Sequence, residues 1–390
     1  MRSRLFLYSG KEKFIDRHHP WIFSGAVRRV DGSPQAGDLV DVLSSDGHWL
    51  AVGHYQPESI CVKVLSYATP DIDDTWWRER VASAVDYRRS MGFFQNADTN
   101  MFRLVHAEGD FLPGLVVDYY NGAVVLQSHS AGMHRETSRV AALLADILGD
   151  KMRCAYDKSA ATLADSVDGF VWGEQRDEWE TREHGIRYLI NICEGQKTGF
   201  FLDQRDNRGM LQSLAQGRRV LNCFGYTGGF SLSALHGGCD YVETVDISKR
   251  AIELCNRNVM LNYGSDASHR GVTDDVMRYL DTVRQDFDII VLDPPAFAKN
   301  HRSLQQGLKG YRSINQRAIE ALPSGGLLFT FSCSQAVSAD DFQTMAFSAA
   351  NLVGKQVRVV RRLGHGADHP VSIYHPEGEY LKGLLLEIEN

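Results

Sequence analysis

The sequence predicts an α/β protein whose C-terminal part is a Rossmann-like, doubly wound parallel sheet, preceded by an N-terminal β-barrel and a central α/β domain. Beyond about residue 190, short apolar runs alternate with longer amphipathic stretches, as in a doubly wound sheet. Short strand-like runs separated by turn residues fill the first 70 residues instead. At 390 residues the chain also exceeds what one core usually organises. We therefore expect domains at residues 1–70, 71–190 and 191–390.

The first two domains are predicted from short patterns. Runs rich in β-branched and aromatic residues predict barrel strands at residues 2–8, 37–43, 49–55 and 60–65. After the break near Pro70, the pattern predicts a helix at 74–91, paired strands at 112–118 and 122–128, and a helix at 133–148.

In the third domain, strands are predicted at residues 219–224, 241–246, 287–292 and 326–332, with a shorter strand-like unit at 271–276. Helical periodicity falls between them at 231–235, 250–262 and 313–322. In a sheet of this kind, ligands bind at the carboxyl ends of the strands. The residues that follow each strand are therefore the candidates for function.

Composition excludes several classes of protein. No stretch approaches the roughly 20 apolar residues that span a bilayer, and the N-terminus lacks the pattern of a signal peptide. We therefore expect a cytoplasmic protein without membrane contact. The seven cysteines are scattered without C-x-x-C spacing, which favours neither a disulfide framework nor a metal site.

Charge is distributed unevenly along the chain. The net charge is −7, yet residues 1–30 hold seven Lys and Arg against Glu12 and Asp16. A basic N-terminal module could bind a phosphate backbone, or it could be an ordinary solvated surface. Charge alone leaves both interpretations open.

The first strand of the third domain ends in a glycine-rich turn, N-C-F-G-Y-T-G-G-F at residues 222–230. Glycines allow a tight turn and a close approach of a ligand as a helix begins. Asp246 ends the second strand, 21 residues after Gly225, where it can accept hydrogen bonds from a ribose. A dinucleotide site would look similar, but the turn departs from G-x-G-x-x-G, which disfavours a nicotinamide oxidoreductase. The candidate ligand contacts in this turn are Asn222, Phe224, Tyr226, Thr227 and Gly228.

Two further carboxylates follow strands. Asp275, with Asp274 as the alternative, precedes Val276 and could accept a bond from an adenine amino group, or simply cap a helix. Asp293 begins a D-P-P segment, in which two prolines stop the strand and fix the backbone. We expect Asp293 to lie at the crevice and to contact a planar base.

These motifs, in this order, resemble those of class I S-adenosylmethionine-dependent methyltransferases. Further segments resemble the RlmI family of 23S ribosomal RNA 5-methylcytosine methyltransferases. They are G-F-F-L-D-Q-R at 199–205, R-H-H-P-W-I-F-S-G-A at 17–26, F-R-L-V-H at 102–106, G-L-V-V-D at 114–118, A-D-H-P at 367–370 and E-G-E-Y-L-K at 377–382.

The resemblance implies an N-terminal PUA domain that binds RNA, a central α/β domain and a C-terminal methyltransferase domain. It also implies S-adenosylmethionine as methyl donor, 23S ribosomal RNA as partner and a homodimer. Gln204 and Arg205 would line the methionine end of the donor, although a salt bridge at a helix start would explain them as well.

The apolar run L-F-T-F ends in Ser332, Cys333 and Ser334. A cysteine at a strand end is most often packing material, and we assign Cys223, Cys239 and Cys255 to that category. The surrounding motifs favour Cys333 as a nucleophile that adds to carbon 6 of cytosine and makes carbon 5 reactive.

Asp293 would serve this chemistry as the acid or hydrogen-bond partner near N3 of the base. The base that removes the proton from carbon 5 is not assigned. Residues 294–296 are P-P-A, so no second cysteine follows Asp293 as it does in many RNA 5-methylcytosine enzymes.

Two other functions remain open. One is methylation of a guanine or adenine nitrogen in RNA, which needs no thiol. The other is a non-catalytic RNA-binding protein of ribosome assembly, which would leave the ordered cofactor motifs unexplained. The sequence assigns no role to Lys299, His369 or Tyr380.

Overall fold

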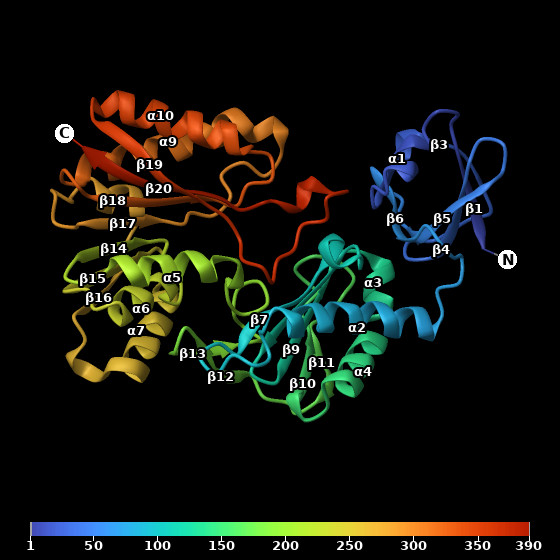
Figure 1. Cartoon of the computed structure of the whole chain (residues 1–390), viewed down its shortest axis with the longest axis horizontal. Helices are drawn as coiled ribbons and strands as arrows, with labels where there is room; N and C mark the ends of the chain where they lie inside the picture. Colours follow the sequence, from blue (N-terminus) through green and yellow to red (C-terminus); the bar gives the residue numbers. More distant parts are fainter. Residues whose placement is uncertain (1, 390) are drawn as a thin grey trace. The chain divides into compact units, whose positions relative to one another are not determined.

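The computed structural model describes residues 2–389, and these form two compact units (Figure 1). Unit 1 comprises the residues up to Arg182 together with Ile190–Leu202 and Ala367–Gly378. Unit 2 comprises Glu183–Leu189, Asp203–Gly366 and the residues from Glu379 onward. The first predicted domain and most of the second fall within unit 1, while Glu183–Leu189 belongs to unit 2. The division into three domains stays a prediction.

The N-terminal part of unit 1 is a six-stranded, mostly antiparallel sheet. Its strands are β1 (Ser3–Leu7), β2 (Trp21–Phe23), β3 (Val27–Asp31), β4 (Leu39–Leu43), β5 (Trp49–Tyr55) and β6 (Ile60–Ser66), in the order β2-β6-β5-β4-β1-β3. The four predicted strands are confirmed. The sequence prediction missed β2 and β3, because β2 has only three residues and the side chains of β3 are almost all exposed, so neither shows a clear apolar alternation.

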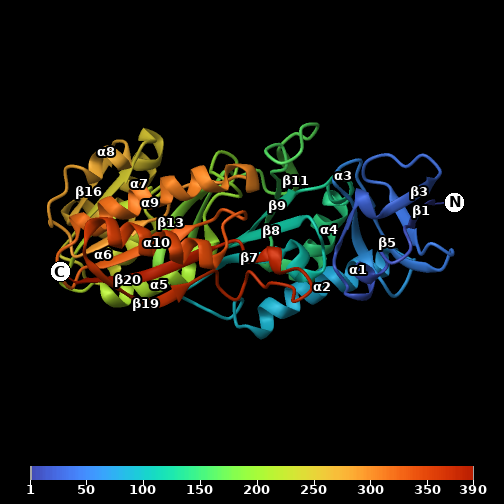
Figure 2. The ribbon, with the colours of Figure 1, turned by 90° about the horizontal axis from the view of Figure 1, so that it is seen from above.

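The second part of unit 1 is a five-stranded sheet flanked by helices. Its strands are β7 (Met101–His106), β8 (Leu115–Tyr120), β9 (Ala123–Ser128), β10 (Cys154–Asp157) and β11 (Gly169–Gly173), in the order β11-β10-β9-β8-β7. The helix α2 (Asp74–Ser90) is present as predicted. The helix expected at residues 133–148 is divided at Glu136 into α3 (Ala131–Arg135) and α4 (Thr137–Leu148). Figure 2 shows β9 and β8 between β11 and β7.

Unit 2 is built on a seven-stranded sheet. Its strands are β14 (Arg219–Cys223), β15 (Tyr241–Asp246), β16 (His269–Thr273), β17 (Ile289–Leu292), β18 (Leu327–Ser332), β19 (Gln356–Leu363) and β20 (Lys382–Glu389), in the order β16-β15-β14-β17-β18-β20-β19. The first five run parallel, whereas β20 is antiparallel to both of its neighbours. The predicted parallel sheet is confirmed, and the prediction lacked β19 and β20.

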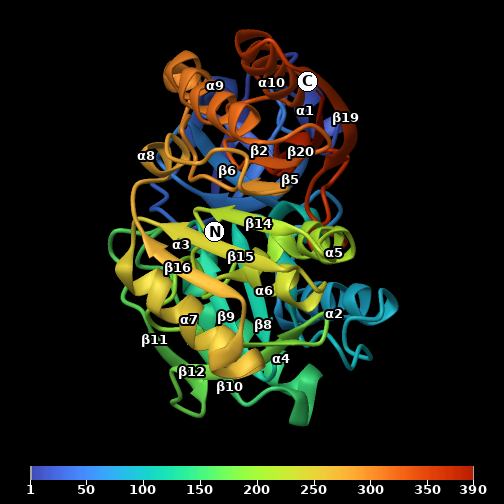
Figure 3. The ribbon, with the colours of Figure 1, turned by 90° about the vertical axis from the view of Figure 1, so that its left-hand side faces the viewer.

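Helices cover both faces of this sheet. They are α5 (Arg205–Leu214), α6 (Gly229–His236), α7 (Lys249–Tyr263), α8 (Val276–Leu280), α9 (Leu304–Ala321) and α10 (Ala339–Val353). One core joins the sheet to α8, α9 and α10, and another joins it to α5 and α6. Figure 3 shows β14, β15 and β16 next to one another, with α5, α6 and α7 nearby.

The chain order along the sheet reverses at β14, which pairs with β15 on one side and with β17 on the other. At such a point the connections leave on opposite faces and open a crevice at the carboxyl ends of the strands. The candidate residues follow β14, β15, β17 and β18, so the fold gathers them at this edge. A hairpin of β12 (Glu178–Glu183) and β13 (Ile186–Asn191) precedes this sheet in the chain. Within residues 2–389, no helix is long and apolar enough to cross a bilayer.

Candidate active site

The turn after β14 has an unusual backbone. Phe224, Tyr226 and Gly228 have φ angles of 58°, 45° and 87°, in the left-handed region that side chains other than glycine rarely adopt. A Cβ atom at Gly225 would lie 2.2 Å from Cγ2 of Thr244 on the neighbouring strand, so a side chain does not fit there. The turn thus runs close against β15 before α6 begins, and the strain at Phe224 and Tyr226 is of the kind that collects at ligand sites.

Asp246 at the end of β15 is held against this turn. The backbone N–H of Tyr226 donates to its Oδ2 at 3.0 Å, and the N–H of Ser248 donates to its Oδ1 at 2.8 Å. Two backbone bonds therefore fix the carboxylate beside the glycine turn. Each carboxylate oxygen can accept a further bond, so Asp246 can receive hydroxyl donors from a ligand.

Two buried polar atoms of the turn have no hydrogen-bond partner among the described residues. They are Oδ1 of Asn222 and the hydroxyl of Thr227. The Nδ2 of Asn222 is engaged, since it donates to the hydroxyl of Ser231 at 2.8 Å. An unsatisfied buried polar group costs about 1–3 kcal/mol. The turn therefore fits a polar ligand such as the methionine and ribose groups of S-adenosylmethionine.

The structure places Asp275 at the start of α8 as its N-cap, where its Oδ1 accepts the N–H of Arg278 at 3.0 Å. Asp274 forms an ion pair with the side chain of the same arginine. Val276 is buried in the core. Asp275 thus caps α8, which is one of the two roles that the sequence allowed. Its contact with an adenine stays a prediction.

Asp293, which follows β17, is oriented by Gln204. The Nε2 of Gln204 donates to Asp293 Oδ1 at 3.0 Å, and Asn207 Nδ2 donates to Gln204 Oε1 at 2.6 Å. Gln204 and its neighbour Arg205 are buried at the start of α5. The G-F-F-L-D-Q-R and D-P-P motifs, 89 residues apart, therefore meet at one place in unit 2.

Cys333 lies directly after β18, next to β17. Its neighbours Ser332 and Ser334 are 0% and 1% exposed, whereas Cys333 is only partly buried. Its Sγ lies 4.0 Å from the carbonyl oxygen of Pro294. The thiol therefore lies close to the D-P-P segment that carries Asp293. A nucleophile that acts on a base bound by this segment would need such a position.

Lys382 supplies a positive charge beside this thiol. It begins β20 opposite Ser332, and its Nζ donates to the carbonyl oxygens of Ser334 and Tyr380, both at 2.7 Å. Burial lowers the pKa of Lys382, and the charges of Cys333 and Glu379 act in the opposite direction. The sequence analysis includes Lys382 in the E-G-E-Y-L-K segment but assigns it no role, because β20 itself was not predicted.

Three other cysteines of unit 2 have pKa values above that of an ordinary thiol. Burial raises the pKa of Cys255 to about 12 and that of Cys239 to about 11. The pKa of the fully buried Cys223 is raised further. These thiols stay protonated near neutral pH and lack the charge that a nucleophile needs.

Three of the motifs that carried the resemblance contact one another within unit 1. Asp368 accepts the N–H of Arg103 on its Oδ2 at 2.8 Å, and its carbonyl accepts from the buried Arg88 at 2.7 Å. Arg103 also forms a bidentate ion pair with Asp118, with hydrogen bonds of 2.8 and 3.0 Å. The A-D-H-P segment with His369 thus ties parts of unit 1 together. In unit 2, Tyr380 donates to Asp203 Oδ2 at 2.7 Å.

Comparison with family models defines the class of this fold and site. Residues 157–372 match the model of S-adenosylmethionine-dependent methyltransferases, and residues 5–67 match that of PUA-like domains. The protein is therefore an S-adenosylmethionine-dependent methyltransferase with a PUA-like N-terminal domain.

Relatives of known name narrow the class. The chain is 38% identical over 400 residues to proteins named ribosomal RNA large subunit methyltransferase I from Escherichia coli strain SMS-3-5 and Shigella dysenteriae serotype 1. These alignments cover 100% of this chain and 100% and 99% of the relatives. The chain belongs to the ribosomal RNA large subunit methyltransferase I family.

Solved structures share the fold over nearly the whole chain. One is a chain described as a methyltransferase in complex with SAH, with a TM-score of 0.86. Another is described as a SAM-dependent methyltransferase from Streptococcus mutans, with a TM-score of 0.85. Both are 23% identical to this chain, and each comparison covers 99% of this chain and 100% of the other.

Proposed function

We propose that the protein methylates carbon 5 of a cytosine in 23S ribosomal RNA, with S-adenosylmethionine as donor and Cys333 as nucleophile. The family supports ribosomal RNA of the large subunit as substrate, since its members carry that activity in their name. The observation that carries the choice of base is the partly buried thiol of Cys333, 4.0 Å from the carbonyl of the D-P-P segment. Methylation of a ring nitrogen or an amino group needs no thiol there.

The residues around the glycine turn would hold the donor. Asp246 would accept from the ribose hydroxyls, and Asn222 and Thr227 would use the buried atoms that have no partner among the described residues. Asp275 and Val276 would lie against the adenine, with Gln204 and Arg205 at the methionine end. Phe224, Tyr226 and Gly228 would contribute through the backbone of the turn. When bound, the donor supplies an electrophilic methyl group.

Cys333 would activate the cytosine ring. Its thiolate adds to carbon 6, forming an Sγ–C6 bond, and the electron pair of the C5–C6 double bond becomes available at carbon 5 as in an enamine. After carbon 5 has gained the methyl group, a base removes its proton. The C5–C6 double bond then re-forms, and Cys333 leaves as thiolate. Lys382, whose ammonium lies beside Cys333, would favour the thiolate in the free enzyme.

Asp293 would bind the N3 and amino edge of the same base and, in its protonated form, would donate a hydrogen bond to N3, where negative charge develops as the thiolate adds to carbon 6. Gln204 supports this role because it fixes Asp293 Oδ1 by a bond of 3.0 Å, so the carboxylate does not reorient when a base enters. The cytoplasmic location and the homodimer remain predictions.

The product identifies the reaction. Purified protein, S-adenosylmethionine and large-subunit RNA from cells that lack the protein are incubated, and the RNA is digested to nucleosides for mass spectrometry. We expect 5-methylcytidine with wild-type protein and none with Cys333→Ala, while the matched variant Cys239→Ala keeps full activity. Methylguanosine or methyladenosine as product would overturn the proposal. If the protein binds both S-adenosylmethionine and RNA but methylates no nucleotide, this result would also overturn the proposal.

A further inference from the structure

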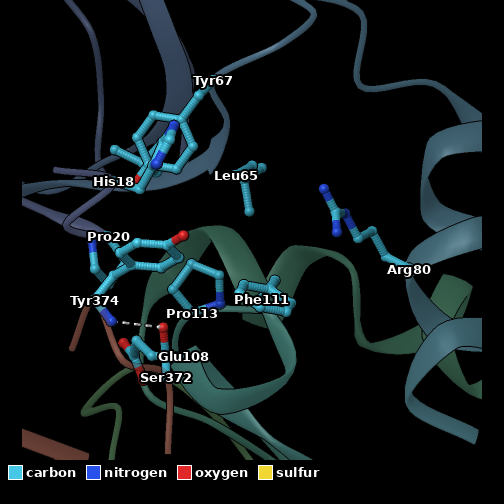
Figure 4. Close-up of a pocket in the computed structure, with 11 residues that line it drawn as sticks. His18, Pro20, Leu65, Tyr67, Arg80, Glu108, Phe111, Pro113, Ser372 and Tyr374 are labelled. Atoms are coloured by element: carbon cyan, nitrogen blue, oxygen red, sulfur yellow. Dashed lines mark hydrogen bonds between the residues drawn. The ribbon is translucent and has the colours of Figure 1, made fainter. Parts of the chain in front are cut away.

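Unit 1 contains a pocket of about 190 Å³ that the methyl-transfer chemistry does not use (Figure 4). Only residues of unit 1 line it, so it is distinct from the cluster around Cys333. Its walls come from three separate parts of the chain: the PUA-like domain, the region from α2 to β8, and the segment after A-D-H-P. The R-H-H-P-W-I-F-S-G-A segment, to which the site around Cys333 gives no role, contributes His18 and Pro20 to this pocket.

Four aromatic rings line the pocket, those of His18, Tyr67, Phe111 and Tyr374. The ring of His18 lies edge-on to Tyr67 at 5.0 Å and to Tyr374 at 5.3 Å between ring centroids. Figure 4 shows these three rings on one side of the space and Phe111 on another. Tyr374 is 42% and Phe111 is 52% exposed, so both residues are accessible to an incoming ligand. Flat apolar walls of this kind suit a planar aromatic group.

Two features of the pocket show unmet bonding or strain. The hydroxyl of Tyr67 is buried and has no hydrogen-bond partner among residues 2–389. His18 has a φ angle of 53°, in the left-handed region that a histidine seldom adopts. A ligand with polar edges would satisfy the Tyr67 hydroxyl, which an aliphatic side chain would not. Strain held at His18 is of the kind found at binding sites.

Charged groups of both signs complete the lining. Arg80 holds its guanidinium 5.9 Å from the centroid of the Phe111 ring. Glu108 accepts from Trp21 Nε1 at 2.8 Å and from Lys63 Nζ at 3.4 Å, both on Oε1. Burial acts to raise the pKa of Glu108, but Lys63 and Trp21 prevail and hold it below its ordinary value. Glu108 is thus an acceptor for N–H groups, and Arg80 is a donor for phosphate.

We propose that this pocket holds one unpaired nucleobase of RNA, outside the site of methyl transfer. The rings stack on the base, the Tyr67 hydroxyl and Glu108 bind its polar edge, and Arg80 contacts the adjoining phosphate. A phosphate and a base with both donors and acceptors match the mixed lining better than an apolar protein side chain does. This inference rests on RNA being the substrate, as in the proposed function, but not on Cys333 or on the identity of the methylated base.

The test uses the full chain without donor and a ten-nucleotide single-stranded RNA with 2-aminopurine at its centre. Fluorescence of the 2-aminopurine reports both binding and stacking. We expect Tyr374→Ala and Phe111→Ala each to raise Kd by about 5-fold to 100-fold, the range for loss of one stacked base. Tyr8→Ala is the matched control, because Tyr8 is 49% exposed in the same unit and does not line the pocket. Its Kd stays that of the wild type.

Three results would overturn the inference: wild-type Kd in both pocket variants, no saturable fluorescence change with wild-type protein, or competition by a blunt duplex as strong as by the single strand. Wild-type Kd in the variants would leave an apolar protein segment as the occupant. Tyr67→Phe keeps the ring and tests the hydroxyl alone, with a smaller rise in Kd expected. Because Cys333→Ala should bind this RNA like the wild type, failure of the thiol mechanism and failure of the pocket give different patterns.

Discussion

The Nζ of Lys382 donates a hydrogen bond of 2.7 Å to the carbonyl oxygen of Ser334, the residue directly after Cys333. A second hydrogen bond of 2.7 Å, to the carbonyl oxygen of Tyr380, fixes the ammonium. Lys382 is 8% exposed. A charge that water barely screens acts strongly on a neighbouring thiol. Lys382 is thus a positioning residue for the nucleophile in our account.

Replacing Lys382 should slow the reaction of Cys333 with alkylating reagents. Without the ammonium, the thiolate loses its stabilising charge, so we expect the midpoint of the pH profile for iodoacetamide labelling to rise in Lys382→Met. One unit of such a rise corresponds to about 1.4 kcal/mol and to about tenfold slower labelling at neutral pH. Mass spectrometry of the labelled peptide measures the rate.

The conservative variant Lys382→Arg keeps the charge and should retain much of the wild-type profile. A merely structural lysine would give a different result, namely a loss of stability with an unchanged pH midpoint for Cys333. That outcome would remove Lys382 from the account and leave the rest intact.

Asp246→Ala should weaken binding of S-adenosylmethionine. Hydrogen bonds to charged groups contribute about 1.5–3 kcal/mol, so the expected rise in Kd is about 10-fold to 100-fold. Isothermal titration calorimetry gives the value directly. Asp240→Ala is the matched control, since Asp240 is an exposed carboxylate at the start of the same strand region. Equal affinity of the two variants would contradict the assignment of Asp246.

The buried ion pair of Arg208 and Glu183 should be essential for the stability of unit 2. Arg208 Nε and Nη2 donate to the two oxygens of Glu183 at 2.5 and 2.7 Å, and both side chains are at most 2% exposed. Arg208→Met leaves a buried carboxylate without its cation and should cost about 3–5 kcal/mol in free energy of unfolding. Denaturant unfolding measures this loss.

Arg361→Met, at an exposed position of β19, should change the stability by less than about 0.5 kcal/mol. Adding Glu183→Leu to Arg208→Met should recover part of the lost stability, because it removes the stranded charge. A double variant less stable than Arg208→Met would show that the pair acts otherwise.

Acid should destabilise unit 1 through His54. Burial, together with the charge of Arg135, lowers the pKa of His54 from 6.5 to about 4. A base with a depressed pKa in the folded state takes up its proton more readily when unfolded, so its share of stability falls as the pH drops from 6.5 towards 4. In His54→Gln, urea unfolding followed between pH 7.5 and 4.5 should therefore lose less stability on acidification than in the wild type. Equal slopes would contradict the assignment.

Much of the candidate active site follows from local sequence patterns. Asp246, Asp293 and Cys333 each end an apolar run that forms a buried strand, so pattern and topology together predicted that they would share one edge of the sheet. The sequence prediction assigned no role to Lys382, because β20 pairs with β18 across a long stretch of intervening chain, from Ser332 to Lys382, and such a pairing leaves no local signal. The pairing of β20 with β18 is what places the Lys382 ammonium beside the Cys333 thiol.

Helix α9 shows a second reason why a prediction from sequence patterns is incomplete. It begins at Leu304, well before the helix predicted at residues 313–322, in a stretch that contains Gly307 and Gly310. Glycines lower the helical signal. In the fold, a Cβ atom at Gly307 would lie 2.6 Å from Cβ of Ala298, so close packing against the segment after D-P-P accounts for the glycine there. Tertiary contact thus overrides local preference at this position.

We propose that Cys333 forms a covalent bond with the target cytosine during methyl transfer. Large-subunit RNA containing 5-fluorocytosine traps that bond, because the fluorine at carbon 5 cannot leave as a proton does. With S-adenosylmethionine, we expect a protein–RNA adduct that survives denaturing electrophoresis, is present in Cys239→Ala and is absent in Cys333→Ala. An active Cys333→Ala enzyme that still makes 5-methylcytidine, or an adduct that persists in that variant, would contradict the account.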